Sequence, residues 1–185
     1  MSDRESIRRL KNGDIGGLET LIARYQLKAV RAAYFIVQDE PTAEDIVQDT
    51  FLHICERIRY FDEARPFEPY LMRSVINAAL NVAKQCERYA PASNDCSPDG
   101  LDRLLAQAES VETQVEFSEI KRQILEAIAS LPARQRAAVV QRYYLDMSEQ
   151  EMAAALSAAP GTVKWLLNAA RSRLRALLGG ERSAK

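Results

Sequence analysis

The stretch that decides the fold is residues 148–174, which read SEQEMAAALSAAPGTVKWLLNAARSRL. Ser148 followed by Glu151 forms a capping box, a pattern that begins a helix. The residues after it have helix-turn-helix spacing, although Ser157 stands where the turn usually has a glycine. The stretch therefore predicts two helices joined by a tight turn, and the second is of the kind that enters a DNA groove.

The second helix of this pair, expected over residues 160–178, has two distinct faces. One arc of the helical wheel is apolar and carries Val163, Leu167, Ala170, Leu174 and Leu177. A neighbouring arc is mainly cationic and carries Lys164, Asn168, Arg171 and Arg175. Residues 164–185 carry six basic side chains and a single acidic one, Glu181. This excess of positive charge favours contact with phosphates. A surface helix with solvated charges is the alternative.

Trp165, the only tryptophan, projects almost opposite the apolar arc of this helix. In a major groove its ring could touch a thymine methyl. Exposed aromatic residues are also enriched in protein interfaces, so contact with a protein or with another part of the chain is the alternative.

The rest of the chain shows the same helical period, and the alternation typical of strands is missing. We expect an all-α protein with helices at about residues 4–11, 18–36, 41–60, 67–88, 113–130, 132–144, 148–157 and 160–178. Between the fourth and fifth helices the texture changes to APASNDCSPDG, and residues 89–113 carry five acidic side chains and one basic. These features predict two small helical domains, 1–88 and 113–180, joined by a flexible acidic linker at 89–112 and followed by a tail at 181–185.

The composition excludes several classes of protein. With 185 residues, of which 47% are hydrophobic and 28% charged, the chain fits a soluble globular protein. No apolar run approaches the roughly 18 residues of a membrane span, and the polar N-terminus lacks a signal-peptide core, so we expect a cytoplasmic protein. Cys55, Cys86 and Cys96 match no disulfide framework, and His53 is the only histidine. We therefore expect no enzyme activity, metal site or cofactor.

The helix expected over residues 67–88 carries a polar stripe beside its apolar face. The stripe mixes aromatic, amide and cationic groups: Tyr70, Arg73, Asn77, Asn81, Lys84 and Arg88. Such a mixture suits a nucleic-acid strand, because aromatics stack on bases, amides bond to base edges and cations hold phosphates. Tyr60, Phe61 and Phe67, at the loop before the helix, could supply further stacking platforms. A place in the core is the alternative for these aromatics.

The helix expected over residues 41–60 carries a predominantly acidic stripe. Its buried arc is predicted to hold Val47, Phe51, Ile54 and Ile58. The other arc holds Asp45, Gln48, Asp49, Leu52, Glu56 and Arg59. Leu52 lies in the middle of these charges, either as an ordinary exposed leucine or as the centre of a protein contact.

Taken together, these segments resemble the extracytoplasmic-function (group IV) sigma factors of the bacterial sigma-70 family, which keep only regions 2 and 4. The stretch AEDIVQDTFLHI at residues 43–54 resembles the helix that binds the polymerase clamp. FDEARPFEPYLMRSVINAALN at residues 61–81 is similar to the promoter-melting segment, with Tyr70 where the family usually has tryptophan. Residues 131–174 resemble region 4.

The resemblance implies a sigma factor that binds core RNA polymerase, at its clamp and flap, and directs it to promoter DNA. Asp45, Gln48, Asp49 and Leu52 would meet the clamp, and the segment from Tyr60 to Arg88 would open the minus-ten element. The minus-thirty-five element would be bound by Thr162, Lys164, Trp165, Asn168, Arg171 and Arg175. The family also suggests control by an anti-sigma factor or another signal, with the two domains closed on one another or around an inhibitor so that both functional faces are covered.

Two other kinds of protein remain open at this point. A helix-turn-helix regulator that acts without polymerase would need the cationic helix but not the acidic stripe with Leu52. A purely protein-binding helical adaptor would need neither of the two cationic stripes.

Overall fold

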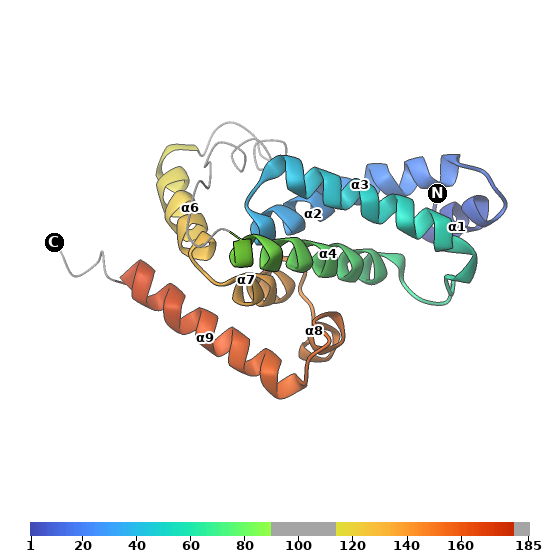
Figure 1. Cartoon of the computed structure of the whole chain (residues 1–185). Coiled ribbons are helices and arrows are strands. Elements are labelled where there is room, and N and C mark those ends of the chain that lie inside the picture. Colours follow the sequence, from blue (N-terminus) through green and yellow to red (C-terminus); the bar gives the residue numbers. More distant parts are fainter. Residues whose placement is uncertain (90–113, 180–185) are drawn as a thin grey trace.

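The computed structural model describes residues 1–89 and 114–179, and within them the chain forms helices and no strand, which confirms the all-α prediction. The first group of helices is α1 (Asp3–Lys11), α2 (Gly16–Val37), α3 (Glu40–Arg57), the 3-10 turn η1 (Ile58–Tyr60) and α4 (Phe67–Tyr89). The second is α6 (Gln114–Ala129), α7 (Ala133–Val139), the π-helical turn η3 (Val140–Tyr144), α8 (Glu149–Ala155) and α9 (Pro160–Gly179). Figure 1 shows both groups. Residues 90–112 of the predicted linker and the predicted tail lie outside the described residues.

The predicted helices agree with these bounds to within a few residues, with two differences at helix ends. The helix expected to run to Tyr60 closes with η1, and the helix expected to run to residue 144 closes with η3, where the Leu145 N–H donates to the carbonyl of Val140. A third difference concerns the glycines, because α2 begins at Gly16 rather than after Gly17. The chain turns earlier, at Gly13, whose φ of 85° suits glycine.

Gly17 instead allows α1 and α2 to approach closely. A Cβ atom at this position would lie 2.2 Å from the backbone oxygen of Ser6. Ser6 is itself fully buried in α1. Any larger residue at position 17 would push the first two helices apart.

The core of the first group lies between α2, α3 and α4. The predicted arc of α3, made of Val47, Phe51, Ile54 and Ile58, is buried as expected. On α4, Leu71 and Val75 are buried as predicted, whereas Ala78 and Val82 are only half-buried. The neighbouring face of α4 is buried as well, with Met72, Ile76, Leu80 and Ala83. A second set of helices must therefore cover this additional face.

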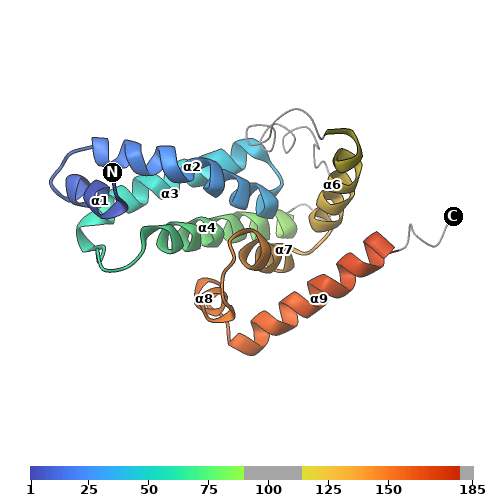
Figure 2. The same cartoon turned by 180° about the vertical axis from the view of Figure 1, so that it is seen from behind.

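That cover is supplied by the second group, because α7 and α8 contact α4, and α7 also contacts α2. In Figure 1 and from behind in Figure 2, α9 lies on the far side of α4 and α7 from α2 and α3. A single cluster of buried residues joins both groups, from Ile7 in α1 to Leu167 in α9.

Polar contacts accompany this apolar packing at the boundary between the two groups of helices, which we call the seam. Arg136 in α7 is only 8% exposed, and its Nε donates to the carbonyl of Ile36 in α2 at 3.0 Å. At the start of α7, the backbone N–H of Ala133 donates to a carboxylate oxygen of Glu87 in α4 at 2.9 Å. The two groups are therefore joined by specific hydrogen bonds at helix ends as well as by apolar packing.

Candidate nucleic-acid and protein interfaces

The start of α8 and the turn before α9 are built as the sequence predicts. The Ser148 hydroxyl accepts from the Glu151 N–H, and the Glu151 carboxylate accepts from the Ser148 N–H, so the capping box is complete. The hydrogen bonds from Ser148 lower the pKa of the Glu151 carboxyl below its ordinary value. Ser157 has a φ of 48°, in the left-handed region that favours glycine, which explains why a turn of this kind usually has glycine there.

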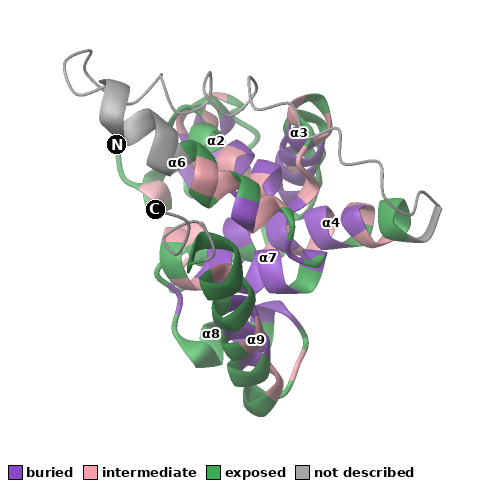
Figure 3. Ribbon diagram, turned by 90° about the vertical axis from the view of Figure 1, so that its left-hand side faces the viewer, coloured by how far each residue is buried: buried purple, intermediate pink, exposed green. Residues whose placement is uncertain are grey.

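The cationic stripe of α9 faces outward along its whole length. Of the predicted apolar arc, Val163, Leu167 and Ala170 are buried, whereas Leu174 is half-buried and Leu177 is exposed. Of the α9 residues expected to contact DNA, five are exposed, Lys164, Trp165, Asn168, Arg171 and Arg175, and Thr162 is half-buried. Trp165 is 64% exposed, so most of its ring is open to a partner. In the ribbon of Figure 3, much of α9 has the green of exposed residues.

One neighbour of this stripe has no counterpart among the residues expected from the sequence. Tyr143, in η3, accepts a hydrogen bond from Nε of Arg171 at 2.8 Å. Lys164 lies 3.6 Å from the Glu149 carboxylate. The sequence offered one clue to Tyr143: adjacent residues of a helix point about 100° apart, so Tyr143 and Tyr144 cannot share one buried direction.

The aromatic and polar residues around α4 divide into exposed and buried sets. Tyr60 is 90% exposed, and Tyr70, Arg73 and Asn81 are exposed as well. Asn77 and Lys84 are half-buried, and the side chain of Arg88 lies outside the described part.

Phe61 and Phe67 take the core alternative in this structure, since Phe67 is only 1% exposed. The Phe67 ring packs against Tyr25 and Phe61 with centroid distances of 5.9 Å in both pairs. The Phe61 ring reaches Tyr70 at 5.0 Å. Phe61 and Phe67 thus support the exposed Tyr70 from below, and neither offers a free ring face to a base.

The acidic stripe of α3 also faces outward. Asp45, Gln48, Asp49, Leu52, Glu56 and Arg59 are all exposed. Leu52 is 59% exposed in the middle of this stripe. Although the two groups of helices are closed on one another, neither this face nor the stripe of α9 is covered.

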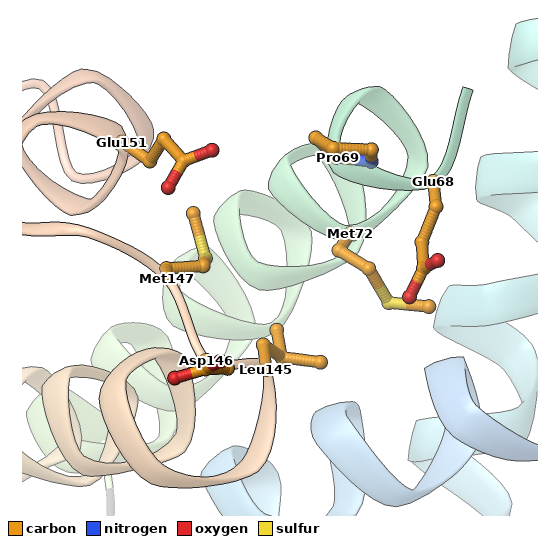
Figure 4. Close-up of a pocket in the computed structure, with 7 residues that line it drawn as sticks. All are labelled: Glu68, Pro69, Met72, Leu145, Asp146, Met147 and Glu151. Carbon is orange, nitrogen blue, oxygen red and sulfur yellow. The ribbon is translucent and has the colours of Figure 1, made fainter. Parts of the chain in front are cut away.

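A pocket of about 200 Å³ opens where α4 meets the segment after η3. Figure 4 shows its lining: Glu68, Pro69, Met72, Leu145, Asp146, Met147 and Glu151. Glu68 is paired with Lys28, and Glu151 belongs to the capping box. Two of the three carboxylates are thus occupied by contacts that hold the fold.

Residues 1–89 and 114–179 also contain histidine, cysteine and carboxylate side chains. No group of three or more His, Cys, Asp and Glu side chains gathers there as a metal site would require. Cys55 and Cys86 are free thiols, and Cys96 lies outside the described residues. None of the described helices has the length and apolarity of a membrane span.

Comparison with known proteins gives a consistent result. Residues 21–89 match the family Sigma-70 region 2, and residues 121–174 match Sigma-70, region 4. The RNA polymerase sigma-H factor of Pseudomonas aeruginosa is 26% identical over 93% of this chain and 91% of its own length. The ECF RNA polymerase sigma factor SigW of Bacillus subtilis is 26% identical over 95% of this chain and 96% of its own.

Solved structures show the same fold. CnrH, in complex with the cytosolic domain of CnrY, superposes with a TM-score of 0.66 at 22% identity, over 96% of this chain and 97% of CnrH. The sigma factor RpoE of Bartonella quintana, in complex with the anti-sigma factor NepR, gives a TM-score of 0.61 at 24% identity, over 87% of this chain and 94% of RpoE. With regions 2 and 4 matched in order along one chain, this protein belongs to the sigma-70 family, in its extracytoplasmic-function (ECF) group.

Proposed function

We propose that this chain is an RNA polymerase sigma factor that binds core polymerase in the cytoplasm and directs it to specific promoters. The observation that carries the proposal is that one chain matches both region 2 and region 4, and exposes an acidic stripe in the first and a cationic stripe in the second. Its family consists of transcription initiation factors rather than enzymes. We further propose residues 1–88 and 113–180 as its two functional units.

The first contact assigned by the proposal is with polymerase. Asp45, Gln48, Asp49 and Leu52 would bind the clamp, because they share a face of α3 that the core does not use. An apolar residue ringed by charges is the arrangement of a protein interface with a desolvated centre. Core packing alone gives no reason for an exposed leucine there.

Contacts with promoter DNA are assigned to two helices. Tyr60, Tyr70, Arg73, Asn77, Asn81, Lys84 and Arg88 would engage the minus-ten element, with Phe61 and Phe67 acting as support rather than as stacking platforms. Thr162, Lys164, Trp165, Asn168, Arg171 and Arg175 would engage the minus-thirty-five element. Exposed cations supply phosphate contacts, while Asn168 and Trp165 are suited to base edges and thymine methyls.

The decisive experiment is run-off transcription with purified core polymerase on a library of genomic promoter fragments. Transcripts that require both the protein and core polymerase would establish the function and reveal the promoter sequence. Promoter binding measured with and without core polymerase separates this proposal from a regulator that acts alone. Binding that is equally tight and specific without core would favour the regulator.

We also propose that an inhibitor protein controls this sigma factor. Two structural neighbours, CnrH and RpoE, were solved with a partner bound, and the partner of RpoE is named as an anti-sigma factor. In this chain the exposed faces of α3 and α9 leave room for such a partner. Purification from native cells in mild salt tests the idea, since recovery only as free protein or polymerase complex across growth conditions would favour control by synthesis alone.

A further inference from the structure

Tyr143 and Tyr144 are adjacent in the chain, and the fold sends their side chains in different directions. The Tyr144 ring turns toward the N-terminal helices and meets Phe35 edge-on, with centroids 5.5 Å apart. Tyr143 turns toward α9 and remains 60% exposed. Core packing therefore accounts for Tyr144 but not for Tyr143.

Tyr143 holds Arg171 of the cationic stripe in one place. Nε of Arg171 donates to the Tyr143 hydroxyl at 2.8 Å, and its Cζ lies 5.9 Å from the centre of the phenol ring. This hydrogen bond restricts the rotamers of a long side chain. This restriction lowers the conformational entropy that Arg171 loses when it binds a ligand.

The contact leaves most donors of both groups available. A guanidinium has five N–H donors, and the bond from Nε uses one, so the terminal Nη groups retain four. Because the Tyr143 oxygen accepts from Arg171, its own O–H is free to donate. Arg171 makes no ion pair with any residue whose side chain the structure describes, whereas Lys164 lies near the Glu149 carboxylate. The pair thus presents a fork of N–H donors and one hydroxyl donor at a single point.

Such a set of donors matches the oxygens of a phosphodiester. Resting on the proposed function, we propose that Tyr143 is a further promoter-contacting residue, which positions Arg171 and donates its hydroxyl to the same backbone phosphate beside the minus-thirty-five element. Phosphate contacts carry no base information, so Tyr143 contributes to affinity and not to sequence preference. Because Tyr143 and Arg171 lie on different elements, their joint contact also fixes the angle at which α9 meets the duplex.

The test uses the protein bound to core polymerase and a promoter fragment obtained from the run-off assay. Tyr143→Phe keeps the ring and removes the hydroxyl. Tyr144→Phe is the matched control, because its ring is directed toward Phe35 rather than α9. Binding of each variant, and of Arg171→Ala, is measured on duplexes in which one phosphate at a time is replaced by an uncharged methylphosphonate.

We expect Tyr143→Phe to weaken promoter binding about ten- to a hundredfold, since it removes a hydrogen bond to a charged group. At one methylphosphonate position this loss should disappear, and at the same position Arg171→Ala should lose its effect. Preference among minus-thirty-five sequences and the thermal midpoint of the protein should stay as in wild type.

Two results would overturn the inference while leaving the proposed function intact. One is wild-type affinity in Tyr143→Phe, and the other is an equal loss at every methylphosphonate position, which would mark a merely structural role. If the wild-type protein forms no promoter complex with core polymerase, the proposed function fails and this inference fails with it.

Discussion

Helices α4 and α9 each carry a polar stripe that the sequence predicts to contact DNA, yet they occupy different places in the fold. α9 lies at an edge, so its stripe from Lys164 to Arg175 is exposed. α4 lies between α2 and α3 of its own group and α7 and α8 of the second group, and Asn77 and Lys84 of its stripe are half-buried. A helical wheel thus identifies the face that packs, but it cannot tell which remaining face another helix will partly cover.

The largest expected effect is on stability, and it should differ between two aromatic residues near the start of α4. Phe67→Ala should lower the free energy of unfolding by about 3–5 kcal/mol, because it empties a fully buried site. Tyr60→Ala should change it by no more than about 0.5 kcal/mol, because that ring is exposed. Urea unfolding measures both. Equal stabilities of the two variants would contradict the division into support and surface.

The stripe of α3 extends the comparison, because it is as open as that of α9 but acidic. Asp45→Lys combined with Leu52→Ala should weaken binding to core polymerase by about 2 kcal/mol or more, as truncation at the centre of an interface does. Glu44→Lys is a matched control, since it reverses a charge on the exposed surface of α3 outside the stripe. Wild-type affinity of the double variant, measured by fluorescence anisotropy, would show that polymerase binds elsewhere.

Promoter opening tests whether the partly covered stripe of α4 is still functional. Tyr70→Ala with Asn77→Ala should reduce opening, since each lost base stack removes about 1–3 kcal/mol. Permanganate reactivity of unpaired thymines reports the open complex, while affinity for core polymerase should be unchanged. If the double variant opens promoters normally, the stripe of α4 does not contact the melted strand.

The next prediction concerns the N-terminal cap of α8, the helix that packs against α9. Ser148→Ala should lower the free energy of unfolding by about 1 kcal/mol. The folded-state pKa of Glu151 is depressed, so its contribution is fully present above the ordinary glutamate pKa and is lost as the pH falls through the lowered one. Unfolding at neutral and acidic pH should therefore show a smaller difference between variant and wild type in acid. A difference that grows in acid would exclude this cap as the cause.

The smallest expected effects distinguish two roles on the exposed side of α9, contact with phosphates and recognition of bases. Arg171→Ala should weaken binding to all minus-thirty-five sequences and lower the salt slope by about one unit. Arg173→Ala removes the same charge from the opposite side of α9 and should leave the slope unchanged. Trp165→Ala should instead alter sequence preference at an unchanged slope. Binding to a randomised element at several salt concentrations tests this, and unchanged preference would assign Trp165 to a protein contact.

The sequence predicts the helices well because helical period and caps are local properties. It also predicts the exposure of Leu52 and Trp165, since each lies opposite an apolar arc on its own helix. It does not predict the burial of Met72 and Ile76 on α4, because that depends on the packing of a second group of helices. Tyr143 was missed for the same reason, since its hydrogen bond to Arg171 joins two elements.

The two hydrogen bonds at the seam mean that each group of helices completes the other. Ile36 lies in the last turn of α2, where carbonyls lack partners within the helix, and Arg136 supplies one from α7. Ala133 begins α7, whose own N-cap residue, Pro132, provides no side-chain acceptor, and Glu87 supplies it from α4. The groups thus exchange caps across the seam, each with the charge that the helix dipole favours. If the two groups separated, both helix ends would lose these caps and fray together. Hydrogen exchange at the Ala133 amide would therefore report the separation of the two groups.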